Sequence, residues 1–157
     1  LLLDGSLSER VSRGLSLLKG KLSGTFFLTN CDLLIFTDYE KLLRFHRESG
    51  SAVTMVCAEK HVTIPYGVVE TGENGVITAM REKPAFQFLT NTGLYLVEPE
   101  VLDDIGEDEV IGFPDIIERQ RRRGRRVSAY TVGDEDWLDM GQLDELEKMR
   151  ERLYGKP

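Results

Sequence analysis

Hydrophobic positions at the start of the chain follow first a helical and then a strand period. Apolar residues recur every three or four positions across residues 6–22, which predicts an amphipathic helix ended by Gly20 or Gly24. Residues 25–29 form a continuous run of β-formers, which predicts a strand buried on both faces. A second helix is expected up to Gly50, with Thr37 or Asp38 as its N-cap.

The rest of the chain continues this alternation and adds a hairpin in the middle. Turn residues 71–75 separate two short strand patterns, which is typical of a hairpin. The further predicted elements are strands at 51–58, 67–70, 76–81, 86–97 (interrupted at 90–93) and 126–132, and helices at 99–105, at 116–123 and from about 141 onward. Alternating strands and helices with a hairpin indicate an α/β fold with a mixed sheet, and residues 1–157 are expected to form a single domain.

Charge and composition narrow the class of protein. The 27 acidic and 20 basic side chains give a net charge of −7, which argues against nucleic acid or an anionic membrane as a partner. No apolar stretch approaches the roughly 20 residues of a membrane span. Cys31 and Cys57 lie in apolar runs, which favours buried thiols in a reducing compartment and predicts a cytoplasmic protein. Because the chain begins at Leu1 rather than Met, we expect a fragment of a longer protein.

Two aspartates follow strand-like segments and are candidates for binding a cation. Asp32 lies in the polar segment that follows the apolar run 25–29, and Asp139 follows Trp137 before the last helix. Ligands of open α/β sheets bind at the carboxyl ends of strands, and carboxylate oxygens suit a hard cation such as Mg²⁺. A turn at Asp32 and an N-cap at Asp139 explain the same residues without any ligand.

Further candidates lie in and around the hairpin. Lys83, after Glu82, is placed where it could hold a phosphate, although the same tripeptide with Pro84 is common in surface turns. Asn91 and Gly93 interrupt an apolar strand, which marks either close approach of a ligand or another backbone, or a β-bulge. The same two interpretations apply to Gly67.

Other reactive-looking residues carry less information. The arginine cluster at residues 119–126 lies at a helix end and lacks interleaved aromatics, so a solvated face is favoured over an RNA site. The histidines, His46 and His61, belong to no recognisable nucleophile motif, which argues against a hydrolase triad.

Taken together, five short segments resemble the sugar-phosphate nucleotidyltransferase family, which makes NDP-sugars. The resemblance covers residues from about 15 to near the end of the chain, and within the family it is greatest to the mannose-1-phosphate guanylyltransferase type. The segments are Phe-Leu-Thr-Asn-Cys-Asp (27–32), Pro-Tyr-Gly-Val-Val (65–69), Glu-Lys-Pro (82–84), Asn-Thr-Gly-Leu-Tyr (91–95) and Trp-Leu-Asp-Met-Gly (137–141).

This resemblance implies a site, a reaction and a fold. Asp32 and Asp139 would be the Mg²⁺ ligands, and Lys83 would contact the phosphate of the sugar 1-phosphate. Sugar-binding positions would be Gly67, Glu82, Asn91, Thr92 and Gly93. The substrates would be an NTP, with GTP favoured, and a sugar 1-phosphate. The implied fold is the Rossmann-like nucleotide-diphospho-sugar transferase fold, with a mixed, mainly parallel sheet flanked by helices.

The chain also departs from the family pattern. The family's glycine-rich loop on its first strand is missing, residues 10–14 do not reproduce the nucleotide-seating segment, and Cys31 replaces a glycine. We therefore expect the C-terminal, sugar-phosphate-binding part of the domain without its N-terminal nucleotide-binding strands, inactive on its own. An unpaired sheet edge would then favour a homodimer or a marginally stable monomer. The alternative is a non-catalytic sugar-nucleotide-binding or regulatory domain with the same fold.

Overall fold

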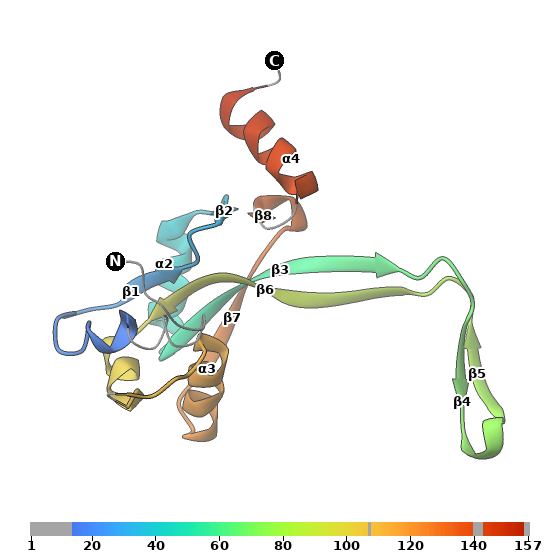
Figure 1. Ribbon diagram of the computed structural model, residues 1–157, viewed down its shortest axis with the longest axis horizontal. Coiled ribbons are helices and arrows are strands. Elements are labelled where there is room, and N and C mark those ends of the chain that lie inside the picture. The colour runs from blue at the N-terminus through green and yellow to red at the C-terminus, as the bar shows by residue number, and fades with distance from the viewer. Residues whose placement is uncertain (1–13, 107, 140–142, 156–157) are drawn as a thin grey trace.

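The computed structural model describes residues 14–106, 108–139 and 143–155, and shows a small α/β body with a long β-ribbon projecting from it (Figure 1). The strands are β1 (Phe26–Thr29), β2 (Leu33–Ile35), β3 (Val53–Thr63), β4 (Val68–Thr71), β5 (Ile77–Arg81), β6 (Ala85–Val97), β7 (Val127–Val132) and β8 (Trp137–Asp139). The helices are α2 (Tyr39–Ser49), α3 (Phe113–Arg122) and α4 (Leu143–Tyr154), with 3₁₀ helices at Glu73–Gly75, Pro99–Asp104 and Asp134–Asp136. Among the described residues, no helix is long and apolar enough to cross a membrane.

The central sheet is mixed, as expected, and has the strand order β1-β6-β3-β7. β3 and β7 pair in parallel, whereas β6 is antiparallel to both β1 and β3. Three of the four strands therefore run in one direction with β6 reversed between them, so only one of the three described pairings is parallel. The resemblance implied a mainly parallel sheet. Most of the strands do run in the same direction, but most of the paired neighbours are antiparallel.

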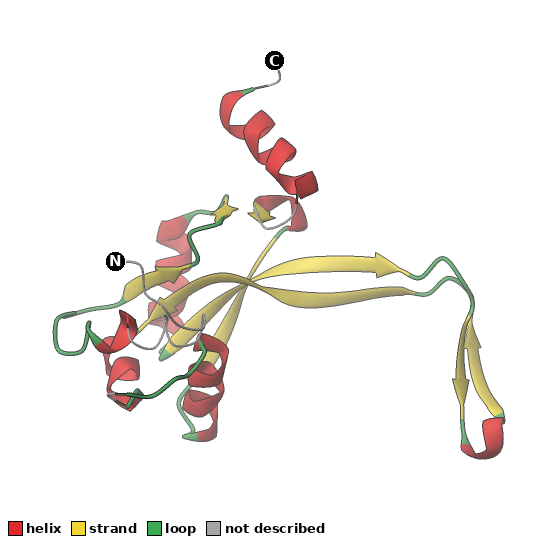
Figure 2. Cartoon of the chain, viewed as in Figure 1, coloured by secondary structure: helices red, strands yellow, loops and turns green. Residues whose placement is uncertain are grey.

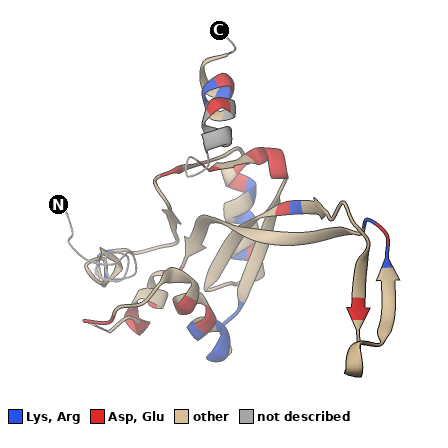
Figure 3. Cartoon of the chain, turned by 45° about the vertical axis from the view of Figure 1, so that its right-hand side comes forward, with Lys and Arg blue, Asp and Glu red and all other residues tan. Residues whose placement is uncertain are grey.

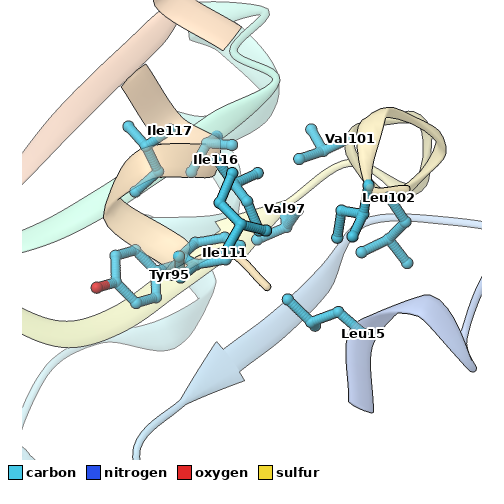
Figure 4. Packing of buried hydrophobic residues seen from close by; sticks show 11 residues of the cluster. Leu15, Tyr95, Val97, Val101, Leu102, Ile111, Ile116 and Ile117 are labelled. Atoms are coloured by element: carbon cyan, nitrogen blue, oxygen red, sulfur yellow. The ribbon is translucent and has the colours of Figure 1, made fainter. Parts of the chain in front are cut away.

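Helices cover both faces of this sheet (Figure 2). On one face, Leu42 of α2 packs with Val56 and Leu96 of the sheet. On the other face, the 3₁₀ helix Pro99–Asp104 and the helix α3 pack against Tyr95 and Val97 (Figure 4). Successive residues of β3 and β6 thus point into opposite clusters, which is the period-2 pattern of a sheet buried on both sides.

Local signals in the sequence fix the bounds of α2. Asp38 is its N-cap and accepts hydrogen bonds from the backbone N–H groups of Glu40 (3.1 Å) and Lys41 (3.0 Å). The bond from Lys41 contributes most to holding the pKa of Asp38 below its usual value. Gly50 ends the helix with a φ of 60°, in the left-handed region that glycine adopts without strain.

Several expectations at the start of the chain need correction. The strand at 25–29 is not buried on both faces: in β1 Phe26 and Leu28 pack against the core, whereas Phe27 on the other face is 43% exposed. Residues 6–13 of the first predicted helix lie outside the described residues, and the described remainder is a short helical turn at 14–16 followed by turns.

The remaining expected elements are found, with two additions. The strand expected at 86–97 is the single strand β6, with an irregularity in its pairing near the expected interruption at 90–93, and the hairpin is formed by β4 and β5. The three-residue strands β2 and β8, which pair with each other, were not predicted, because three residues are too few to show a period.

Candidate functional site

A cavity of about 470 Å³ opens where β1 ends, beside the middle of β6, the start of α3 and the strand β8. This is the carboxyl end of β1, the edge at which open α/β sheets bind ligands. Its lining consists of Leu28, Thr29, Asn30, Asn91, Thr92, Gly93, Tyr95, Gly112, Phe113, Pro114, Trp137 and Asp139. Four of the eight predicted site residues, Asn91, Thr92, Gly93 and Asp139, are thereby brought together.

The centre of this site is a β-bulge in β6. Met55 pairs with Tyr95 and Cys57 with Asn91, so three residues of β6 lie opposite the single residue Val56 of β3. The sequence offered a β-bulge and the close approach of another backbone as explanations of this interruption. Both occur here, because the segment around Asn30 also lies close to Gly93. The bulge turns the backbone of β6 toward the cavity.

Gly93 is required by this geometry. Its φ is +87°, and a Cβ at this position would lie 2.6 Å from Nδ2 of Asn30. The backbone N–H of Asn30 also donates to the carbonyl of Gly93 at 3.1 Å. The end of β1 is therefore held against the bulge, which fixes one wall of the cavity.

Asn91 is held in place by hydrogen bonds within the bulge. Its Oδ1 accepts from the backbone N–H of Gly93 at 3.0 Å, and its Nδ2 donates to Oη of Tyr95 at 2.6 Å. Tyr95 is buried, and this burial raises the pKa of its phenol. A carboxamide has two donor hydrogens and two acceptor lone pairs, so Asn91 keeps one of each for a ligand.

Thr92 differs from its neighbours because its hydroxyl is used inside the sheet. Its Oγ1 donates to the carbonyl of Val56 at 2.8 Å and accepts from the backbone N–H of Leu94 at 3.3 Å. The side chain is buried. These bonds satisfy the backbone groups that the bulge leaves without a ladder partner, so a contact of Thr92 with a ligand would involve its backbone.

The short β2–β8 ladder brings the two candidate cation ligands close in the fold. Asp139 lies opposite Leu33, and Asp32 precedes Leu33 by one residue. Asp139 lines the cavity, whereas Asp32 is exposed in the turn after β1 and is not among the lining residues. Cys31, expected to be buried, is exposed in the same turn.

Gly67, Glu82 and Lys83 lie in another region, where β3 and β6 meet the β4–β5 hairpin. A Cβ at Gly67 would be 3.1 Å from Oε2 of Glu82, so these two residues are in contact range of each other. Lys83 adopts a φ of 44° in the turn between β5 and β6. All three are exposed and none lines the cavity, so the structure does not unite them with the other five predicted residues.

Some lining residues were not singled out from the sequence as site residues. Asn30 lies in the segment 27–32 that carries the resemblance, but no site role was predicted for it. Gly112 and Pro114 mark the start of α3, where none of the described side chains caps the helix. Trp137 lies in one of the segments that carry the resemblance, and its buried Nε1 has no hydrogen-bond partner among the described residues. Only the tertiary structure shows that the start of α3 faces the β6 bulge.

Other candidate chemistry is accounted for by structural roles. Within the described residues, no group of three or more His, Cys, Asp or Glu side chains is arranged to hold a metal. Buried His46 contacts Thr54 Oγ1 at 2.7 Å and Glu98 Oε1 at 2.9 Å, bridging α2 and the sheet. Arg121 and Arg122 pair with Glu118 on the exposed surface, as expected for a solvated helix face.

A second, larger hollow of about 660 Å³ lies at the other end of the sheet. It is formed around His46, Glu98 and Arg126, and it contains none of the predicted site residues. The helix α2 ends there at Gly50, and basic side chains at a helix C-terminus are favourable without any ligand. The smaller cavity, with its glycine-dependent wall, is therefore the better candidate site.

Comparison with known proteins assigns the chain to a family. The family model described as "Nucleotidyl transferase" matches residues 11–154. Among curated proteins, a UTP--glucose-1-phosphate uridylyltransferase of Synechocystis sp. is 33% identical over 131 residues, which cover 76% of this chain and 32% of the relative. The catalytic subunit beta of a mannose-1-phosphate guanylyltransferase of Drosophila melanogaster is 32% identical over 129 residues, with the same two coverages.

Solved structures agree on the fold. HddC from Yersinia pseudotuberculosis superposes with a TM-score of 0.62 at 16% identity, over 90% of this chain and 61% of HddC. The chain spans about a third of the length of the two curated relatives. It is a member of the nucleotidyl transferase family and has the fold of the sugar nucleotidyltransferases.

Proposed function

We propose that this chain provides the sugar-1-phosphate-binding part of an enzyme that transfers a nucleotidyl group from an NTP to a sugar 1-phosphate. The observation that carries the proposal is the cavity that unites Asn91, Gly93 and Asp139 at the carboxyl end of β1. The curated relatives support the substrate class, since their names specify glucose 1-phosphate and mannose 1-phosphate. GTP and mannose 1-phosphate remain the favoured pair on the resemblance of the sequence.

The reaction needs little acid–base chemistry from the protein. An anionic phosphate oxygen of the sugar 1-phosphate attacks the α-phosphorus of the NTP, and the bond from this phosphorus to the bridging α–β oxygen breaks. NDP-sugar forms and pyrophosphate leaves with the electron pair of that bond. Because the nucleophile is already ionised, catalysis depends on positioning and on neutralising charge. A site without a histidine base fits this requirement.

The chain's own residues would orient the sugar. The free donor and acceptor of Asn91 are suited to sugar hydroxyls, and the backbone of the bulge, open because residue 93 is glycine, lets a sugar approach closely. Asp32 and Asp139 would hold Mg²⁺, which commonly binds proteins through one or two carboxylates and substrate phosphates. Mg²⁺ would supply positive charge at the reacting phosphates. Asp32 directly precedes Leu33, the ladder partner of Asp139, so these two carboxylates fit the one or two that Mg²⁺ commonly uses.

The charge of the cavity determines how a sugar phosphate could bind there. Its described lining includes the carboxylate of Asp139 but neither Lys nor Arg. A sugar phosphate would therefore meet no fixed cation within the cavity itself. We expect its binding to depend on Mg²⁺, and on Lys83 if the hairpin region closes toward the cavity.

Calorimetric titration of the chain with mannose 1-phosphate and glucose 1-phosphate tests the proposal. With Mg²⁺ we expect binding of at least one sugar phosphate, weakened roughly tenfold or more by chelating the metal or by Asp139→Asn, since a charge-assisted contact is worth about 1.5–3 kcal/mol. Asp103→Asn, an exposed aspartate of the Pro99–Asp104 helix, is the matched control and should bind normally.

Further variants and ligands test the role of Lys83 and distinguish the enzyme from the non-catalytic alternative. The Lys83→Ala variant, with exposed Lys21→Ala as control, should bind more weakly if Lys83 reaches the phosphate. A folded chain that binds neither sugar phosphate would contradict the proposal. Tight binding of an NDP-sugar that Asp32→Asn and Asp139→Asn leave unchanged would instead favour the non-catalytic sugar-nucleotide-binding domain.

A further inference from the structure

A lysine outside the cavity contacts one of its walls. Nζ of Lys60 lies over the indole of Trp137, 4.9 Å from the centroid of the ring. Trp137 lines the cavity, whereas Lys60 is not among the lining residues. An effect of Lys60 on a ligand in the cavity would therefore pass through Trp137, and the proposed function assigns Lys60 no role.

Lys60 lies where two strands of the central sheet separate. β3 and β7 pair in parallel up to Ala58 and Val132. After this pair, β3 continues to Thr63 beside β6, whereas β7 ends and the chain turns into the 3₁₀ helix Asp134–Asp136. Lys60 comes two residues after Ala58, so the backbone pairing of the two segments has already ended at its position.

The ammonium group of Lys60 joins the two segments beyond that point. It donates a hydrogen bond to Oδ1 of Asp134, the first residue of the 3₁₀ helix, and lies over Trp137, the first residue of β8. This acidic 3₁₀ helix lies close to β3 (Figure 3). A cation over the face of an aromatic ring is attracted by the quadrupole of the ring, and tryptophan is the best such partner. One side chain thus ties both ends of the segment 134–137 to β3.

The surroundings of Lys60 favour both contacts. Only 25% of its side chain is exposed, compared with 69% for Lys41, whose ion pair with Asp38 lies on the surface at the start of α2. Water and salt screen an exposed ion pair, whereas a cation–π contact becomes stronger as the cation loses water. The contacts of Lys60 therefore fix its ammonium group more firmly than the surface pair fixes that of Lys41.

The indole of Trp137 depends on such a contact for its orientation. Its buried Nε1 has no hydrogen-bond partner among the described residues. The ring packs against the apolar cluster that includes Ile35 and Val132, but hydrophobic packing is non-directional. The contact with Lys60 is directional, because the ammonium group must lie over the face of the ring. Lys60 therefore contributes an orientation that apolar packing leaves open.

The strand that begins at Trp137 also carries the proposed metal ligand. Trp137 and Asp139 are the first and last residues of β8, and both line the cavity. Residues two apart in a strand point to the same face, so a shift of the backbone at Trp137 would also displace the carboxylate of Asp139. The anchor on Trp137 therefore affects two parts of the cavity wall.

We propose that Lys60 is a positioning residue, which holds the indole of Trp137 in place as a wall of the cavity. The inference rests on the proposed function for its ligand, a sugar 1-phosphate. The charge of Lys60 is paired with that of Asp134, so its effect on this anionic ligand comes mainly from the placement of the ring. Another cation at this position should then preserve the site, and a neutral side chain of similar length should not.

Fluorescence tests the placement of Trp137 directly, because it is the only tryptophan of the chain. Lys60→Met keeps an unbranched side chain and removes the ammonium group, so we expect acrylamide to quench the indole about twofold more strongly. Lys60→Arg should be quenched like the unchanged chain, because guanidinium groups also stack on aromatic rings. Lys41→Met is the matched control, since it removes an ion pair of α2 and should leave the quenching unchanged. Circular dichroism of each variant establishes that it is folded.

Calorimetric titration in Mg²⁺, with the sugar phosphate that the unchanged chain binds, tests the consequence for the site. We expect Lys60→Met to bind roughly threefold to tenfold more weakly, because the ring and Asp139 are less well placed. Lys60→Arg and Lys41→Met should bind normally.

The two measurements separate this inference from the proposed function. Equal quenching of Trp137 in Lys60→Met and in the unchanged chain would overturn the inference. So would stronger quenching without a loss of affinity, or a loss that Lys60→Arg shares. If the unchanged chain binds no sugar phosphate, the proposed function fails, and the quenching, measured without a ligand, still decides whether Lys60 holds Trp137.

Discussion

At the scale of single residues, the most informative position is Gly93. From sequence, a glycine in an apolar strand had two explanations, and the structure shows that a bulge and a close approach occur together. The backbone at Gly93 is in the left-handed region, and the side chain of Asn30 occupies the space beside its Cα. The same glycine therefore shapes the cavity and permits the contact between β1 and β6.

Replacing Gly93 with alanine should destabilise the chain. The added Cβ would meet Asn30 Nδ2, and a non-glycine residue at this φ is strained, so we expect a loss of about 1–3 kcal/mol in the free energy of unfolding. Urea denaturation followed by circular dichroism measures it. Gly24→Ala is the control, because a Cβ at Gly24 would have no neighbour within 4 Å. Equal stability of the two variants would contradict the bulge geometry.

Residue-level prediction was most successful where a residue's role is local. Asp38, one of the two residues expected as N-cap, and Gly50 are the caps of α2, because capping depends on the nearest backbone groups only. The roles of Asn30 and Trp137 in the cavity depend on contacts with distant segments. No local pattern in the sequence could reveal those contacts.

At the scale of elements, α2 is tied to the sheet by a polar link as well as by apolar packing. The imidazole of His46 bridges Thr54 of β3 and Glu98 at the end of β6, and Thr25 Oγ1 donates to the same carboxylate oxygen at 2.6 Å. His46 and Thr54 are buried. This network joins α2 and β3 to the start of β1 and the end of β6, at the end of the sheet opposite the cavity.

Removing the imidazole should therefore weaken the packing of α2 on the sheet. His46→Leu keeps an apolar side chain but leaves the buried hydroxyl of Thr54 without its partner, which costs about 1–3 kcal/mol. Arg44→Leu, on the exposed side of the same helix, is the control for changing charge and helix propensity. If both variants unfold at the same urea concentration, the link from His46 does not contribute to stability.

Prediction of the elements succeeded where a pattern was long enough to show its period. The hairpin was predicted at nearly its observed position, whereas the strand expected at 51–58 continues to Thr63 in β3, and β2 and β8 were missed. Sheet order and burial required information beyond the period. The run 25–29 has the composition of a strand buried on both faces, yet in β1 only Phe26 and Leu28 pack against the core, and Phe27 and Thr29 on the other face are exposed.

At the scale of the whole molecule, the predicted site residues fall into two groups. Asn91, Thr92, Gly93 and Asp139 surround the cavity in the body, with Asp32 in the adjoining turn. Gly67, Glu82 and Lys83 lie where β3 and β6 meet the β4–β5 hairpin. Their order along the chain indicated the family, but it did not reveal this separation. A sugar phosphate that contacts both groups of residues would require the β4–β5 hairpin to approach the cavity.

The central claim is that a sugar 1-phosphate binds in the cavity formed by the β6 bulge, and it can be tested by mapping the bound ligand. Two-dimensional ¹H–¹⁵N NMR of the chain with Mg²⁺ and mannose 1-phosphate should show shifted backbone amides at residues 91–95, Asn30 and Asp139. Amides around the hollow of His46 and Arg126 should not move. Saturating ligand that shifts only the second set, or shifts no amide of the folded chain, would contradict the account.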